Sequence, residues 1–366
     1  MINFIGQYKF SDYGCNNMKN VLITCIKIGM AGSLSLILLS FFCYFYEFMG
    51  VYATCSDNST DSKYAADTRV SNMVEGFGQL TLDSNGYNNI DNTPLSEKPV
   101  NILYMGSSNS EGFQVDADEN VTHLLDEKLP NLRVYSIAMS GHFLDTNVNN
   151  LADAVKAYNP TDYVIIETPY INPSEGAMTA ALTPRPSEPV CDTATKLAIN
   201  KYCCSIRSLN RAKSDIMLGS SSPVNLLSES FSTLSLVAHA KGNASDNESY
   251  EECLDTFLSY ADDCMPENCK LIIIWHTPVK FNSTGDLLVN EEKAEQSRIF
   301  KEDCDKNGII FVDMTDRLQK LYSNNHGFAQ GFENTGINEG HLNRHGHKAL
   351  ADALYETILS DMDAEL

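Results

Sequence analysis

The sequence predicts an α/β protein in which a parallel sheet is covered by helices on both faces. Two observations lead to this prediction. Short apolar runs rich in β-branched and aromatic residues recur from residue 99 onward, and amphipathic segments of helix length alternate with them. Such alternation is typical of parallel sheets. The expected strands are "VNILYM" (100–105), "LRVYSIA" (132–138), "DYVIIET" (162–168), "KLIIIWH" (270–276) and "GIIFVD" (308–313).

Four segments between and after these runs are expected to be helices. Their apolar residues recur at helical spacing, as Val121, Leu125 and Leu129 do in the first of them. A long stretch separates the third apolar run from the fourth, and we interpret about 173–265 as a mainly helical insertion or lid over the strand ends. The expected helices are "NVTHLLDEKL", "TNVNNLADAVKAY", "NEEKAEQSRIFKEDCDKN" and "NRHGHKALADALYETIL".

The N-terminal part of the chain contains a long uncharged segment. The run from Ile28 to Tyr46 carries no charge and has about the length that crosses a bilayer as a helix. Lysines precede it and acidic residues follow it, so the positive flank is expected to stay in the cytoplasm. A cleaved signal peptide is the alternative, but "GVYATC" is a poor cleavage site. We therefore expect an uncleaved, single-pass anchor with the C-terminal domain outside the cytoplasm.

These patterns divide the chain into four regions. Residues 1–27 form a cytoplasmic tail, 28–52 a transmembrane anchor, 53–98 a polar stalk and lead-in, and 99–366 the α/β domain. The formal net charge of -22 repels nucleic acid, which excludes DNA and RNA as partners. The cysteines beyond the anchor form either disulfides or free thiols, and the absence of any C-x2-C pair disfavours a zinc site.

A glycine- and serine-rich segment, "YMGSSNSEG", directly follows the first expected strand. Catalytic groups of parallel sheets gather at the carboxyl ends of the strands. Glycine permits a tight turn there, and a serine in the turn has backbone N–H groups nearby that can stabilise an oxyanion. The G-x-S-x-G elbow does not fit, because position 110 is serine. The alternative is a loop without a catalytic role.

A nucleophilic serine needs a base, and a cluster of histidines precedes the last expected helix. His341 lies on the loop, whereas His345 and His347 lie in the start of the helix. The loop histidine is the one that can reach over the strand ends. The H-x3-H-x-H spacing has no matching acidic or cysteine motif, so neither a metal nor any other cofactor is predicted.

Together these segments resemble the SGNH/GDSL hydrolases. Gly106, Ser108 and Gly112 match the fixed positions of the first block, with Ser107 in place of its aspartate. "IAMSGH" is similar to the second block, and "GHLNRHG" is similar to the last. The resemblance spans about residues 80 to 362 with the insertion unmatched. It implies a three-layer, flavodoxin-like fold with strand order 2-1-3-4-5, Ser108 as nucleophile, His341 as base and the Gly141 N–H as an oxyanion donor.

Two departures from the family pattern affect the site. The family's orienting aspartate falls on Asn338, so we expect the adjacent Glu339 to orient His341; a Ser–His dyad or a backbone carbonyl is the alternative. The third block is absent, and "ETPYINPSEG" follows the third strand instead. We expect Asn172 from that segment to supply the missing oxyanion donor.

The resemblance implies a serine esterase that removes O-acyl groups, most simply acetyl groups, from cell-surface carbohydrate. The expected partners are an acylated carbohydrate or another small ester, and a membrane bound through the N-terminal helix. One alternative is an O-acyltransferase that passes the acyl group to a surface polysaccharide. Another is a catalytically inactive protein of the same fold that binds glycan or acts as a scaffold.

Overall fold

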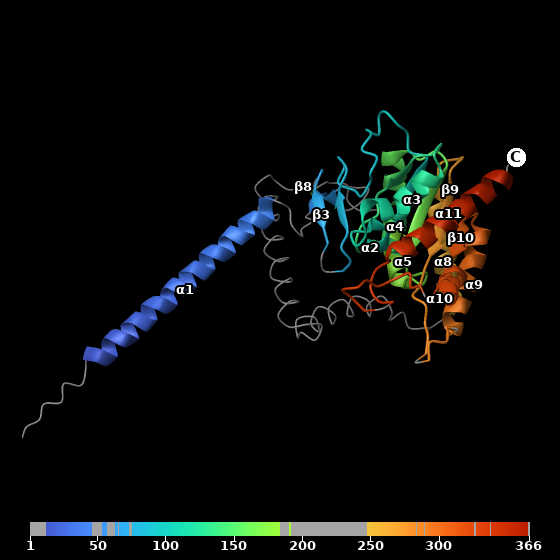
Figure 1. The fold of residues 1–366 in the computed structure, drawn as a ribbon. Helices are drawn as coiled ribbons and strands as arrows, with labels where there is room; N and C mark the ends of the chain where they lie inside the picture. The colour runs from blue at the N-terminus through green and yellow to red at the C-terminus, as the bar shows by residue number, and fades with distance from the viewer. Residues whose placement is uncertain are drawn as a thin grey trace, which may run out of the picture.

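A computed structural model of the chain describes eleven ranges: 12–45, 53–56, 63–64, 66–72, 75–183, 190–191, 247–282, 284–288, 290–325, 327–336 and 338–364. Its centre is a parallel five-stranded sheet (Figure 1). In spatial order the strands are β10 (Ile310–Asp313), β9 (Lys270–Trp275), β7 (Tyr163–Thr168), β5 (Ile102–Met105) and β6 (Val134–Ser136). Numbered along the chain, this is the flavodoxin-like order 2-1-3-4-5, so the predicted class and strand order are confirmed.

Each expected strand forms, one to two residues shorter at one or both ends. The strands β5, β6, β7 and β9 are almost fully buried because helices cover both faces, which explains why their sequences are largely apolar instead of alternating, whereas the edge strand β10 is only partly buried. Successive residues still point to opposite faces: Leu103 and Ile102 of β5 belong to different core clusters. The register is regular, with Tyr104 opposite both Ser136 and Ile165.

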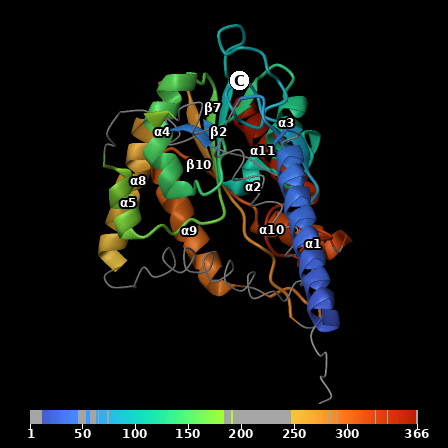
Figure 2. The same ribbon diagram turned by 90° about the vertical axis from the view of Figure 1, so that its left-hand side faces the viewer.

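Helices form a layer on each side of the sheet, as Figure 2 shows. One face packs against α4 (Leu144–Tyr158), α5 (Glu175–Ala181), α8 (Asn247–Asp263) and α9 (Glu291–Lys306). The other face packs against α3 (Val121–Lys128), α10 (Thr315–Asn325) and α11 (Arg344–Ala364). The four expected helices correspond to α3, α4, α9 and α11. The three-layer architecture that the sequence predicts is therefore present.

Local sequence explains where the helices begin and end. Asn120 precedes α3 and its side chain accepts the Thr122 N–H; Asn290 does the same for Lys293 in α9. The helix α4 ends at Asn159, which adopts a left-handed conformation with φ of 46°. A short 3-10 turn, η1 (Ala117–Glu119), leads into α3. These caps fix where the helices begin and end. The loops that precede the helices carry the residues of the site described below.

Part of the region between the third and fourth strands belongs to the helical layer. Met178 of α5 and Leu254 of α8 are buried in the core cluster on one face of the sheet. These two segments of the expected insertion are therefore structural parts of the domain. The remainder of the expected insertion, apart from the strand β8 (Val190–Cys191), lies outside the described residues.

The lead-in to the domain includes a hairpin of β3 (Arg69–Ser71) and β4 (Gln79–Thr81). Val70, Leu80 and Leu82 form a small core with Phe113. Phe113 directly follows the serine-rich segment 106–112, so the hairpin packs on the chain next to that segment. A separate antiparallel sheet comprises β1 (Ala53–Ser56), β2 (Lys63–Tyr64) and β8. Residues in the region expected to act as stalk and lead-in thus contact the domain.

The N-terminal helix α1 (Asp12–Phe45) is the one described helix with the length and composition of a membrane span. Its most apolar section, Asn20–Leu39, is not buried against other described residues. A signal sequence has the same properties. The expected apolar N-terminal helix is therefore confirmed, while its retention and its orientation stay predictions.

Candidate active site

The serine-rich turn forms a short helix, α2 (Ser108–Glu111), at the carboxyl end of β5. Ser107 caps it, because the Ser107 hydroxyl accepts the Asn109 N–H. Gly112 ends it with φ of 65°, a conformation that favours glycine. Gly106 has no room for a side chain, since a Cβ there would lie 2.8 Å from Glu167 Oε2. The glycines thus permit the sharp turn that leaves Ser108 half-buried at the carboxyl end of β5.

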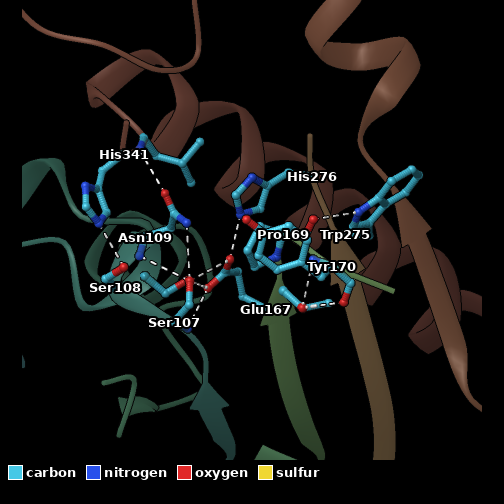
Figure 3. A network of polar contacts seen from close by, with 12 residues as sticks. Ser107, Ser108, Asn109, Glu167, Pro169, Tyr170, Trp275, His276 and His341 are labelled. Carbon is cyan, nitrogen blue, oxygen red and sulfur yellow. Dashed lines mark hydrogen bonds and ion pairs between the residues drawn. The ribbon is translucent and has the colours of Figure 1, made fainter. Parts of the chain in front are cut away.

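Ser108, His341 and Glu75 form a continuous chain of hydrogen bonds. His341 Nε2 lies 2.8 Å from Ser108 Oγ, and Figure 3 shows this contact. On the other side of the imidazole, Nδ1 lies 2.5 Å from Glu75 Oε2. The His341 N–H also donates to Glu75 Oε1 at 2.6 Å, so one carboxylate fixes both the ring and the backbone of this residue. This is the arrangement of nucleophile, base and orienting carboxylate.

The carboxylate that contacts His341 is therefore Glu75, in place of the expected Glu339. Glu339 is exposed and makes no hydrogen bond or ion pair with any described residue; its carboxylate lies beside Gly336 instead. Asn338 has a left-handed backbone with φ of 58°, and its side chain donates to the Val279 carbonyl. The chain thus turns these side chains away from His341. Nothing in the sequence around Glu75 marks it, because it lies far from His341 in the chain.

Several contacts hold Glu75 against the imidazole. Glu75 lies in the turn between β3 and β4, and the neighbouring Gly76 N–H donates to Asn334 Oδ1 at 2.9 Å. In return, the Asn334 amide donates to the Gly76 carbonyl. Gly340 lets the carboxylate approach, since a Cβ at this position would lie 2.1 Å from Glu75 Oε1. These contacts therefore join the β3–β4 hairpin to the loop that contains His341, called the histidine loop below.

Replacing Gly340 by alanine tests this close approach. We expect Gly340→Ala to lower kcat/KM by about 100-fold, because the new Cβ displaces the Glu75 carboxylate by an ångström or more. Gly308→Ala is the matched control, because Gly308 also has a positive φ but open space around it. It should lose about 1 kcal/mol of stability and keep its activity. Equal loss of activity in both variants would contradict the role assigned to the contact.

Two backbone N–H groups are available to an oxyanion near Ser108. Neither the Ser108 N–H nor the Gly141 N–H donates to an acceptor within the described part of the chain. The Met139 N–H donates to the Gly106 carbonyl at 3.0 Å, which places the loop after β6 beside the nucleophile turn. Gly141 adopts φ of 84° and is solvent-exposed. Asn172 lies in the loop after β7, exposed and without a hydrogen bond to described residues, and its role stays a prediction.

A buried carboxylate, Glu111, supports the Gly141 loop. It accepts hydrogen bonds from the Ser140 hydroxyl, from the Ser140 backbone N–H and from Tyr64. Burial raises the pKa of the Glu111 carboxyl to about 7, although these hydrogen bonds and the charge of His341 act in the opposite direction. The Ser140 N–H is thereby occupied, whereas the neighbouring Gly141 N–H donates to no acceptor among the described residues.

This raised pKa predicts a pH-dependent stability. The Glu111 carboxyl holds its proton more tightly in the folded chain than in the unfolded one, so its contribution is full below about pH 4.5 and is lost as the pH rises to about 7. At 1.36 kcal/mol per pKa unit, the loss is about 3 kcal/mol. Urea unfolding of the full-length chain in detergent, compared with Glu111→Gln between pH 4.5 and 7, measures it. Parallel pH profiles of the two proteins would show that Glu111 is not the group responsible.

A second buried carboxylate, Glu167, holds the nucleophile turn from below (Figure 3). Glu167 Oε2 accepts the Ser107 N–H at 2.8 Å and the Ser110 hydroxyl at 2.9 Å. Its other oxygen lies 2.6 Å from His276 Nε2, and both side chains are fully buried. Burial acts to raise the pKa of Glu167, but the hydrogen bonds and the charge of His276 outweigh it and hold the pKa below its usual value. The His276 imidazole is therefore enclosed.

The remaining histidines of the C-terminal cluster are not part of the triad. His347 is fully buried, its Nδ1 accepts the Val121 N–H, and burial lowers its pKa to about 3. It is therefore a neutral structural residue. His345 lies at the start of α11 and is exposed. Asn109 joins the nucleophile turn to the histidine loop, because its side-chain oxygen accepts the Leu342 N–H at 3.1 Å.

The fold and this geometry place a hydrogen-bonded Ser108–His341–Glu75 arrangement at the carboxyl end of the sheet of a flavodoxin-like α/β domain. No family model matches the sequence, and no curated protein matches it. Solved structures of esterases and GDSL-type lipases do match, the group that the sequence blocks resemble. An acetyl xylan esterase, AlAXEase, is 15% identical with a TM-score of 0.39, over 70% of this chain and 98% of its own.

Two other matches have similar values. The psychrotrophic esterase EstA from Pseudoalteromonas sp. is 12% identical with a TM-score of 0.37, over 72% of this chain and 98% of its own. A GDSL-like lipase from Bacteroides thetaiotaomicron is 12% identical with a TM-score of 0.35, over 73% and 91%. Values this low establish no function for the chain. The fold assignment rests on the strand order described above, and the reaction is inferred from the site.

Proposed function

We propose that this protein is a membrane-anchored serine esterase that removes O-acetyl groups from carbohydrate outside the cytoplasm. The observation that carries the proposal is the hydrogen-bonded chain from Ser108 through His341 to Glu75. A serine hydroxyl within hydrogen-bond reach of an oriented imidazole is what acyl transfer to serine requires. The carbohydrate and its location follow from the family resemblance and from the apolar helix α1, and they need separate tests.

In the proposed mechanism His341 Nε2 takes the Ser108 proton while Ser108 Oγ attacks the ester carbonyl. The N–H groups of Ser108 and Gly141 stabilise the oxyanion, with the Asn172 amide as a possible third donor. His341 then passes its proton to the leaving sugar oxygen, which leaves an acetyl group on Ser108. A water molecule, deprotonated by His341, releases acetate and restores the serine. Glu75 stays ionised throughout and stabilises the imidazolium.

The test is turnover of acyl esters of increasing chain length by the full-length chain in detergent, followed by acetylated oligosaccharides. Highest kcat/KM with acetyl esters, and acetate release from the oligosaccharides, would support the proposal. Activity confined to long acyl chains would instead favour a lipase. Transfer of the acetyl group to an added sugar in preference to water would favour the acyltransferase. No turnover and no acyl-enzyme with any ester would refute the proposal.

A further inference from the structure

A cavity beside the histidine loop contains two lysines. It has a volume of about 440 Å³ and lies at the carboxyl ends of β9 and β10. Its walls are the segment 277–280 after β9, the first turns of α9 and the residues around the start of α10. Ligands of doubly wound folds bind at this end of the sheet, outside the carboxyl ends of the strands. Ser108 and His341 do not line the cavity, so it is distinct from the triad.

The lysines are Lys280, which is exposed, and Lys293, which is half-buried. The Lys293 ammonium donates to the Thr277 hydroxyl. Neither lysine forms an ion pair with a carboxylate anywhere in the described ranges. Burial lowers the pKa of Lys293, and the positive charge of Lys280 lowers it further, while Glu292 acts weakly in the opposite direction. The two ammonium groups therefore repel each other within the same cavity.

Two carboxylates also line the cavity, but neither forms an ion pair with the lysines among the described residues. Asp313 lines it, but its carboxylate accepts the Ser297 hydroxyl and the Thr315 N–H. Asp316 also lines it and is exposed in the first turn of α10. A partly desolvated ammonium beside a second one is unfavourable unless an anion lies between them. The whole chain carries a formal net charge of -22, which makes a cavity with two unpaired lysines unusual in this molecule.

Backbone contacts connect the cavity to the catalytic residues. The Asn338 side chain donates to the carbonyl of Val279, which lines the cavity, at 2.6 Å, and Asn338 precedes His341 by one short turn. In the same wall, Thr277 follows His276, whose imidazole contacts Glu167 beneath the nucleophile turn. Val279 and Asn338 thus join the cavity wall to the loop that carries His341.

We propose that this cavity binds an anionic group, a carboxylate or a phosphate, that the carbohydrate ester carries on its sugar part. The inference rests on the proposed function, since it names a substrate class for that site. Lys293 and Lys280 supply charge-assisted hydrogen bonds to the anion. A neutral ester has no such contact and binds through the triad region alone. The cavity thus determines specificity and has no part in the acyl transfer itself.

The experiment compares three acetylated oligosaccharides with the full-length chain in detergent. One is uncharged, one carries a uronic acid and one carries a phosphate monoester. We expect KM to be about tenfold lower for at least one charged ester than for the neutral one. Lys293→Met should abolish this difference. Lys301→Met is the matched control on the same helix, where the exposed lysine pairs with Asp305, and it should preserve the difference.

The outcomes separate this inference from the proposed function. Equal KM values for all three esters in the unmodified protein would overturn the anionic site while the esterase stands. A difference that persists in Lys293→Met and also in Lys280→Met would overturn it as well, and Lys280→Met decides the question if the first variant does not fold. A lower KM for the phosphate ester alone, or for the uronic acid alone, identifies the anion. No turnover of any ester would refute the esterase and the inference together.

Discussion

Ser108→Ala is expected to abolish turnover, with kcat reduced by about a million-fold relative to the unmodified protein. Ser108 Oγ is the atom that His341 Nε2 contacts, and alanine leaves nothing to carry the acyl group. The same substitution should abolish labelling by a fluorophosphonate, which reacts with activated serines. Labelling followed by intact-mass measurement checks both the stoichiometry and the residue.

Ser360→Ala is a suitable control for this experiment, because Ser360 is exposed near the end of α11. It should keep both activity and labelling. Ser110 is not a suitable control, since its hydroxyl contacts Glu167 and its loss would disturb the turn itself. If Ser108→Ala still formed a covalent adduct at the rate of the unmodified protein, Ser108 could not be the nucleophile.

Glu75→Gln is expected to lower kcat by about 10,000-fold with little change in KM. Glutamine preserves the shape of the side chain, but it lacks the charge that stabilises the His341 imidazolium and can fix the ring in the wrong tautomer. Glu339→Gln is the matched comparison for Glu75→Gln. It should stay within about twofold of the unmodified protein, because Glu339 makes no contact with the imidazole.

The pair distinguishes three possible arrangements of the site. A large loss in Glu75→Gln alone supports the triad described above. A large loss in Glu339→Gln alone would mean that the histidine loop rearranges on binding substrate. Little loss in either variant would indicate a Ser–His dyad. Circular dichroism and thermal unfolding of both variants exclude misfolding as the cause.

The sequence predicted those features that depend on short segments. Each strand lies in a short apolar run, and burial on both faces of the inner strands makes such runs easy to recognise. Glycines on either side of the serines mark a turn after a strand, but the choice of Ser108 within that turn relied on the match of Gly106, Ser108 and Gly112 to the SGNH/GDSL pattern. His341 could be placed because it lies on the loop before the last helix.

The sequence could not predict Glu75. Its contact with His341 joins positions 266 residues apart, in a polar segment whose composition is that of a linker. The prediction of Glu339 relied on closeness along the chain, but the left-handed backbone at Asn338 and the glycine at 340 direct the side chains elsewhere. Proximity in sequence is a poor guide in a loop whose backbone is left-handed at both Asn338 and Gly340.

The position of Glu75 also sets a lower limit on the size of an active fragment. The segment that connects α1 to the sheet carries the carboxylate of the triad, in a hairpin that packs on the domain. A truncated protein starting at residue 99 would retain all five strands of the sheet and both Ser108 and His341, yet it would lack this group. Proteolytic release between the hairpin and the sheet would therefore switch the enzyme off, whereas cleavage upstream of β2, which keeps Tyr64 beside Glu111 and Glu75 beside His341, would release it in working form.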